Sequence, residues 1–206
     1  MQTDWAGENL QVIRTLMERA SLYRRALAPI MLTLGALGLA GGVLGHLLDW
    51  NNNARFVGFW FAFAVLALAA AFLLVRRQAL KAEEPFWSPP TRRVALALLP
   101  ALVMGGTFGV AMITQGNGDS VKTSLIALWL MMYGTGLLAA GFFVRRGIKL
   151  LGWVFLILGG FLLLFVHWVP VLANLSVHLL MGGTFGGLHL AYGIYLRFTE
   201  ASPDPA

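Results

Sequence analysis

The residues of this sequence that could bind a cofactor or a solute are histidines and threonines in otherwise apolar stretches. His46 and His178 both fall near one predicted membrane surface, and His167 lies close to the same surface. Two imidazole nitrogens at one depth can supply the axial ligands of a b-type haem, so His46 and His178 form a candidate haem b site. The alternative is that neighbouring hydroxyls or carbonyls satisfy these histidines, as they do most buried polar groups.

A second candidate site comes from a repeated hexamer. The letters MGGTFG occupy residues 104–109 and return at residues 181–186. Both copies fall near the middle of an apolar stretch that is long enough to cross a bilayer. Their carbonyls and hydroxyls, with one histidine, predict a pathway for a small solute or ion. The residues concerned are Gly105, Gly106, Thr107, Gly182, Gly183, Thr184 and His189.

The hexamer also has a purely structural interpretation. Glycines four residues apart share one helix face and let a second backbone approach closely, so the third and sixth apolar stretches are expected to cross at these glycines. Thr107 and Thr184 would then donate hydrogen bonds to carbonyls of their own helices. A glycine motif alone does not choose between packing and a site.

Several chemistries lack the residues that they need. The chain has no cysteine, which excludes disulfides, thiolate metal sites and cysteine nucleophiles. No apolar stretch carries a charged residue in its interior, which disfavours proton-coupled antiport through a carboxylate. Phosphate loops, nucleophile elbows and metalloprotease helices are also missing from the sequence. We therefore assign no catalytic residue and no metal site, and expect a protein that is not an enzyme.

The elements that carry these residues are predicted to be transmembrane helices. The chain of 206 residues is 58% hydrophobic and only 12% charged, whereas soluble domains have about 25% charged residues. Six continuous apolar runs reach the length of about 20 residues that a bilayer requires. They cover residues 29–48, 56–75, 94–114, 123–144, 148–166 and 173–196. The predicted fold class is an all-α polytopic membrane protein.

The distribution of basic residues predicts the orientation. Of 15 Lys and Arg residues, only Arg55 and Lys122 lie beside the ends that face away from the rest. The positive-inside rule therefore places both termini in the cytoplasm and the chain in an inner (cytoplasmic) membrane. Because topology explains the net charge of +6, no nucleic-acid partner is expected.

Internal similarity predicts that the six helices form two halves. The stretch LVMGGTFGVAM aligns with LLMGGTFGGLH, and Gly38 and Gly45 align with Gly134 and Gly141. Because each half has three helices, the second half enters the membrane from the opposite side, which makes a 3+3 inverted repeat. The predicted parts are a cytoplasmic amphipathic helix (1–26), two three-helix repeats (27–115 and 116–197) and a short cytoplasmic tail (198–206). The amphipathic spacing within 1–26 fits a helix in the membrane interface, and equally a dimerisation helix.

These features favour a membrane transporter or channel-like protein for a small solute or ion. The alternatives are a haem b-binding or accessory subunit of an electron-transfer or other membrane complex, and a partner protein that binds through its glycine faces. The expected partners are the lipid bilayer and either further copies of the chain or a second membrane subunit. The sequence does not identify the transported species.

Overall fold

The computed structural model describes residues 27–50, 52–81, 83, 85–114, 118–143, 146–165 and 175–200. All regular structure in these residues is helical, which confirms the all-α fold class. The helices are Leu27–Leu48, α2 (Asn53–Lys81), α3 (Pro89–Ile113), α4 (Asp119–Ala140), α5 (Arg146–Phe165), α7 (Val177–Met181), the π-helix η2 (Gly182–Gly186) and α8 (Gly187–Glu200). The first of these is called the first helix below. The last three follow one another without a gap and together form the sixth helix.

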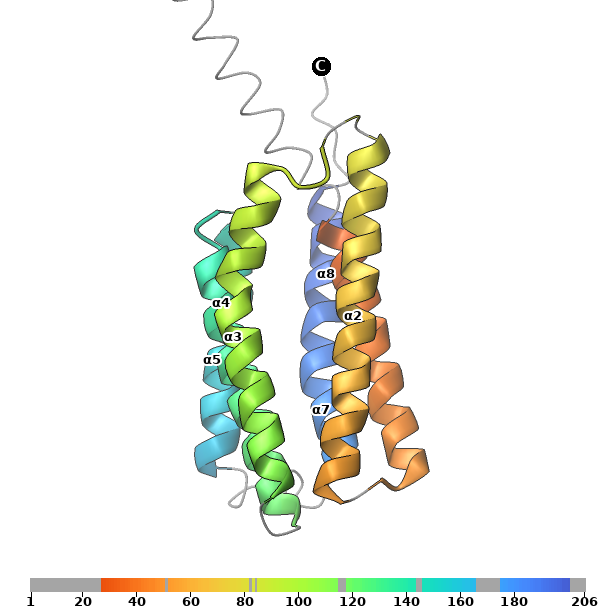
Figure 1. Cartoon of the computed structure of the whole chain (residues 1–206), viewed down its shortest axis with the longest axis vertical. Helices are drawn as coiled ribbons and strands as arrows, with labels where there is room; N and C mark the ends of the chain where they lie inside the picture. Colours follow the sequence, from red (N-terminus) through yellow and green to blue (C-terminus); the bar gives the residue numbers. More distant parts are fainter. Residues whose placement is uncertain are drawn as a thin grey trace, which may run out of the picture.

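Five of these helices are long and apolar enough to cross a membrane. The sixth helix also spans the full height of the bundle, although its π-helical part divides it into shorter segments (Figure 1). The fourth apolar run was expected to continue to residue 144, but α4 ends at Ala140. There the amide of Gly141 donates to the Leu137 carbonyl and the chain turns over residues 141–143. The expected amphipathic helix over 1–26 lies outside the described residues.

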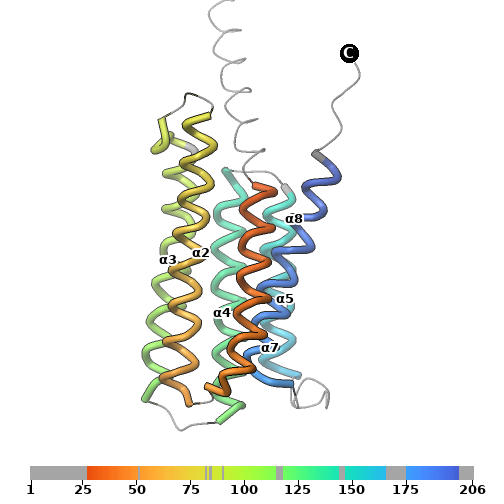
Figure 2. The backbone as a smooth tube through the Cα atoms, turned by 90° about the vertical axis from the view of Figure 1, so that its right-hand side faces the viewer, coloured from red at the N-terminus to blue at the C-terminus, as the bar shows by residue number. Residues whose placement is uncertain are grey.

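Consecutive helices run in opposite directions along the long axis of the molecule (Figure 1). The first helix begins, and α8 ends, at the end of the bundle that also holds the α2–α3 connection. We call this the upper end and the opposite one the lower end. α2 and α3 stand together as a hairpin against the other four helices (Figure 2). α4 is the most central helix, since 56% of its most apolar 18-residue segment is buried, compared with 17% of the corresponding segments of α2 and α3.

Two pairs of helices pack through glycines at very short range. α4 and α5 meet where a Cβ on Gly134 would lie 2.7 Å from the Gly152 carbonyl oxygen. The first and sixth helices meet along a second line of contact, which we call the glycine seam. A Cβ on Gly38 would lie 2.6 Å from Gly186 Cα, and one on Gly182 would lie 2.6 Å from Gly42 Cα. Only residues without a side chain permit this approach of two backbones.

The α2–α3 hairpin is buried unevenly along its length. Every buried residue of α2 lies in its first eight positions, at the lower end: Asn53, Phe56, Val57, Phe59 and Trp60. Beyond Trp60, no described side chain of α2 is buried. α3 packs along α4, from Gly109 against Trp129 in its lower part to Ala101 and Leu98 against Gly136 in its upper part. α2 is therefore buried in the bundle only at the lower end, whereas α3 holds the hairpin against α4 along its length.

Candidate functional site

The two copies of the repeated hexamer have different backbone conformations. Residues 104–109 are ordinary α-helix within α3, whereas Gly182–Gly186 form a π-helix. The hydroxyl of Thr107 donates to the Val103 carbonyl at 2.9 Å, and that of Thr184 donates to the Leu180 carbonyl at 2.7 Å. Both threonines thus bond within their own helices, as the structural interpretation of the hexamer predicted.

The glycines of the two copies also face different neighbours. Gly182 and Gly186 lie in the glycine seam against the first helix. Gly105 instead lies against Trp129 of α4, whose indole nitrogen donates to the Gly105 carbonyl at 2.8 Å. The prediction that the third and sixth helices cross at these glycines was therefore wrong. The short connection between the antiparallel helices α3 and α4 places α3 beside α4, and the sixth helix instead meets the first.

The predicted pathway residues do not converge on one point. Gly106 and Thr107 line an open groove between α2 and α3, together with Phe61, Val110 and Ala111. Gly183 is exposed, and a Cβ there would meet nothing within 4 Å. Of the predicted pathway set, His189 and Gly105 each have a polar contact with α4, His189 through its side chain and Gly105 through its backbone carbonyl.

His189 forms a polar centre at the middle of the bundle. It lies about 18 Å from the start of α7 and about 16 Å from the end of α8, at 1.5 Å per residue. Its Nε2 is 2.8 Å from the hydroxyl of Tyr133 on α4, and its Nδ1 is 2.7 Å from the Phe185 carbonyl. Because a carbonyl only accepts hydrogen bonds, Nδ1 carries the proton and Nε2 accepts from the tyrosine hydroxyl.

Aromatic rings surround this Tyr133–His189 pair. The imidazole centroid lies 5.3 Å from Phe155 and 5.5 Å from Phe185, and the side chain of His189 is only 1% exposed. The carbonyl that it engages belongs to the π-helix, where bonding from residue i to i+5 changes the usual pairing of carbonyls. The sequence contains one signal for Tyr133, which is a polar hydroxyl at the middle of an apolar run.

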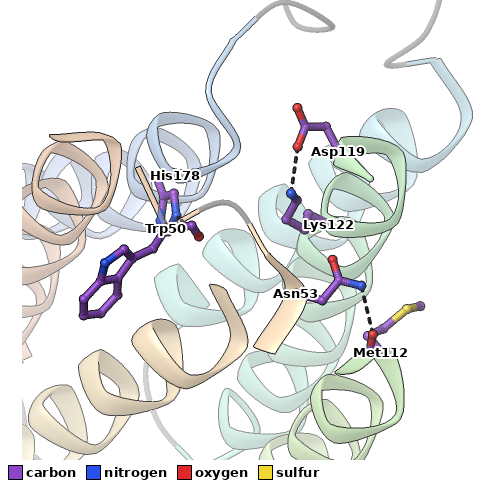
Figure 3. A network of polar contacts seen from close by, with 6 residues as sticks. All are labelled: Trp50, Asn53, Met112, Asp119, Lys122 and His178. Carbon is purple, nitrogen blue, oxygen red and sulfur yellow. Dashed lines mark hydrogen bonds and ion pairs between the residues drawn. The ribbon is translucent and has the colours of Figure 1, made fainter. Parts of the chain in front are cut away.

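A second set of polar side chains lies at the lower end of the bundle (Figure 3). The side-chain amide of Asn53 donates to the Met112 carbonyl at 3.0 Å and so joins the start of α2 to the end of α3. The ammonium of Lys122 lies 2.8 Å from the carboxylate of Asp119, and only 4% of the lysine side chain is exposed. From the sequence, Lys122 is only a marker of orientation, because its burial depends on helices that are distant in sequence.

His178 belongs to the same lower end and is completely buried. Its Nε2 lies 3.3 Å from the Trp50 carbonyl, and the rings of Phe56, Phe59 and Trp60 lie within 6.2 Å of its own. A Cβ on residue 45 would come within 2.2 Å of His178 Nδ1. The imidazole therefore fits into the space left by a glycine of the first helix.

Haem binding by His46 and His178 stays a prediction. One nitrogen of His178 faces the Trp50 carbonyl, and the other faces the backbone of the first helix. His46 is exposed, although its neighbour Gly45 contacts His178. His167 lies outside the described residues. Among the described residues, no three His, Asp or Glu side chains gather as a metal site.

Comparison of the chain with protein-family models, curated proteins and solved structures found no match. The interpretation of the site therefore depends on its own geometry.

Proposed function

We propose that this chain is an integral membrane transporter or channel-like protein for a small neutral solute, with the Tyr133–His189 pair as its polar centre. The observation that carries this proposal is a buried, hydrogen-bonded histidine at the middle of a membrane-spanning bundle. Polar groups at that depth are costly in hydrocarbon, and in membrane proteins they mark solute and ion pathways.

The position of the pair between two packed units supports movement. α4 and α5 are joined by close glycine contacts, and so are the first and sixth helices. The Tyr133–His189 hydrogen bond joins one unit to the other at mid-depth, among the rings of Phe155 and Phe185. A shift of the units relative to each other would break this one bond and leave two polar groups to bind a solute. Such rocking of rigid units around a central site is how many transporters alternate access.

The π-helix supports the same proposal. A π-helical segment inside a transmembrane helix is locally less regular than α-helix, and such segments are frequent at functional sites. Here it lies directly before His189 and supplies the carbonyl that holds the imidazole. Conversion of Gly182–Gly186 to α-helix would rotate the residues that follow and would move His189 away from Tyr133.

A neutral substrate is favoured by the composition of the spans. The interior of the apolar runs has no Asp, Glu, Lys or Arg to balance a charged solute. The centre offers one hydroxyl and one imidazole, which donate and accept hydrogen bonds as polyols and small amides do. The Gly/Thr residues of the two hexamers then have a packing role around the centre.

The proposal includes an inverted 3+3 repeat and an inner-membrane location with both termini in the cytoplasm. The repeated hexamer and the opposite entry of the two halves support the repeat. The aligned glycines nevertheless differ in their contacts, since Gly38 faces Gly186 of the sixth helix and Gly134 faces Gly152 of α5. The charge asymmetry supports the orientation.

The test is solute flux into vesicles that contain the purified chain. Stopped-flow light scattering would follow the swelling of vesicles in glycerol, urea and acetamide, with empty vesicles as the baseline. We expect swelling above this baseline for at least one solute, and a large loss per folded molecule in Tyr133→Phe and in His189→Gln. Tyr195→Phe is the matched control, because Tyr195 is 59% exposed. Swelling at the empty-vesicle rate with all three solutes would refute the proposal for this class of substrate.

A further inference from the structure

The upper tip of the α2–α3 hairpin has a composition that the proposed transport function does not use. α2 has 29 residues and is about 43 Å long, whereas the hydrocarbon core of a bilayer is about 30 Å thick. Its last turns therefore extend beyond the hydrocarbon, and so does the first turn of α3. We call this part the hairpin tip. Its residues in this argument are Phe72, Arg76, Arg77, Lys81, Phe86, Trp87, Arg92 and Arg93.

The charge of the hairpin tip is strongly one-sided. All five of its Arg and Lys side chains are exposed, and Glu83 is the one acidic residue described near them. Within the described part of the chain, none of these five cations forms an ion pair; Lys122 and Asp119 pair at the opposite end. The tip therefore presents several positive charges without a protein counter-charge among the described residues.

Aromatic side chains lie beside these charges. The ring of Phe86, in the connection, packs on Phe72 of α2 at 4.7 Å and on Trp87 at 6.1 Å. Trp87 is 58% exposed. Phe72 comes one helical turn before Arg76 on α2, and Trp87 comes just before the first turns of α3, which carry Arg92 and Arg93, so the aromatic rings lie among the cations. Tryptophan and its aromatic neighbours settle at the level of lipid headgroups, which fixes the depth of the tip.

We propose that the hairpin tip binds the headgroups of anionic phospholipids. The aromatic rings place these five cations, which have no ion-pair partner among the described residues, at the level of the lipid headgroups, where each Lys or Arg near an anionic leaflet gains about fivefold in binding, equivalent to about 1 kcal/mol. A soluble acidic partner would have to displace lipid from this position.

The experiment measures lipid preference with the full chain in mixed micelles. Energy transfer from tryptophan to acyl-labelled phosphatidylglycerol or phosphatidylcholine gives the ratio of their association constants. We expect at least a fivefold preference for phosphatidylglycerol in the wild-type protein at low salt. This preference should fall toward one in 1 M salt, where the screening length is about 3 Å.

Variants then locate the preference on the protein. The fourfold variant Arg76→Gln, Arg77→Gln, Arg92→Gln and Arg93→Gln is expected to lose it, and Arg55→Gln at the lower end is expected to keep it. Equal binding of the two lipids by the wild-type protein, or a preference that survives the fourfold variant, would overturn the proposal. If the fourfold variant does not fold, Arg92→Gln with Arg93→Gln alone should still lower the preference below that of the wild-type protein. None of these outcomes depends on whether the chain transports a solute.

Discussion

Replacement of Gly182 by alanine tests the glycine seam directly. The added Cβ would lie 2.6 Å from Gly42 Cα and 2.8 Å from the Gly38 carbonyl oxygen. Carbon atoms pack best at about 3.5–4.0 Å, so the first and sixth helices must separate by about 1 Å. Such a separation forfeits much of the dispersion energy along the seam, and overpacking of this kind costs about 1–3 kcal/mol.

The assay is the thermal stability of the detergent-purified protein. For a chain of this length, each kcal/mol lowers the melting temperature by about 2–4 °C, so Gly182→Ala should melt about 2–12 °C below the wild-type protein. Gly183→Ala is the matched control, because it makes the same chemical change in the same π-helix where a Cβ meets nothing within 4 Å. We expect the control to keep the wild-type melting temperature. A Gly182→Ala variant that is as stable as this control would refute the reasoning.

Two further predictions concern the polar centre and the orientation. Tyr133→Phe should destabilise the protein by about 1–3 kcal/mol, because the buried Nε2 of His189 loses its donor, whereas the exposed Tyr195→Phe should have no effect in the same melt. Since the chain has no cysteine, Arg55→Cys and Lys81→Cys each create a single label site. A membrane-impermeant maleimide should label Arg55→Cys in intact cells and Lys81→Cys only after permeabilisation. Labelling of both from one side would contradict the predicted topology.

The sequence predicted the helices well because their signal is local. A run of apolar residues long enough to span a bilayer must satisfy its own backbone hydrogen bonds, and helix is the structure that does so within one segment. Five such helices, with ends close to the expected ones, are present among the described residues. The errors lie at the ends, as at Ala140, where hydropathy continues but the backbone turns.

The candidate site was predicted only in part. His189 was chosen from its spacing along the sixth helix, and it is buried in a polar contact, while its role in a site stays a prediction. Its partner Tyr133 was missed, because the two residues are 56 positions apart and only helix packing brings them together. The surroundings of His178 were missed for the same reason, since the carbonyl and the glycine that face its nitrogens come from the first helix and the residues that follow it. The haem site stays a prediction.

The sequence by itself determined that this chain forms apolar helices that alternate in direction, and which of their ends are basic. Both properties follow from the composition of single segments and from the length of a bilayer span. The tertiary structure alone decided which helix each glycine faces, and it gave identical hexamers an α-helix in one place and a π-helix in the other. The physical reason is that Gly182 and Gly186 must fit against the backbone of the first helix, whereas Gly105 leaves room for the indole of Trp129. Such contacts depend on the neighbouring helix, so they differ between the two copies of the hexamer although the sequence of both copies is identical.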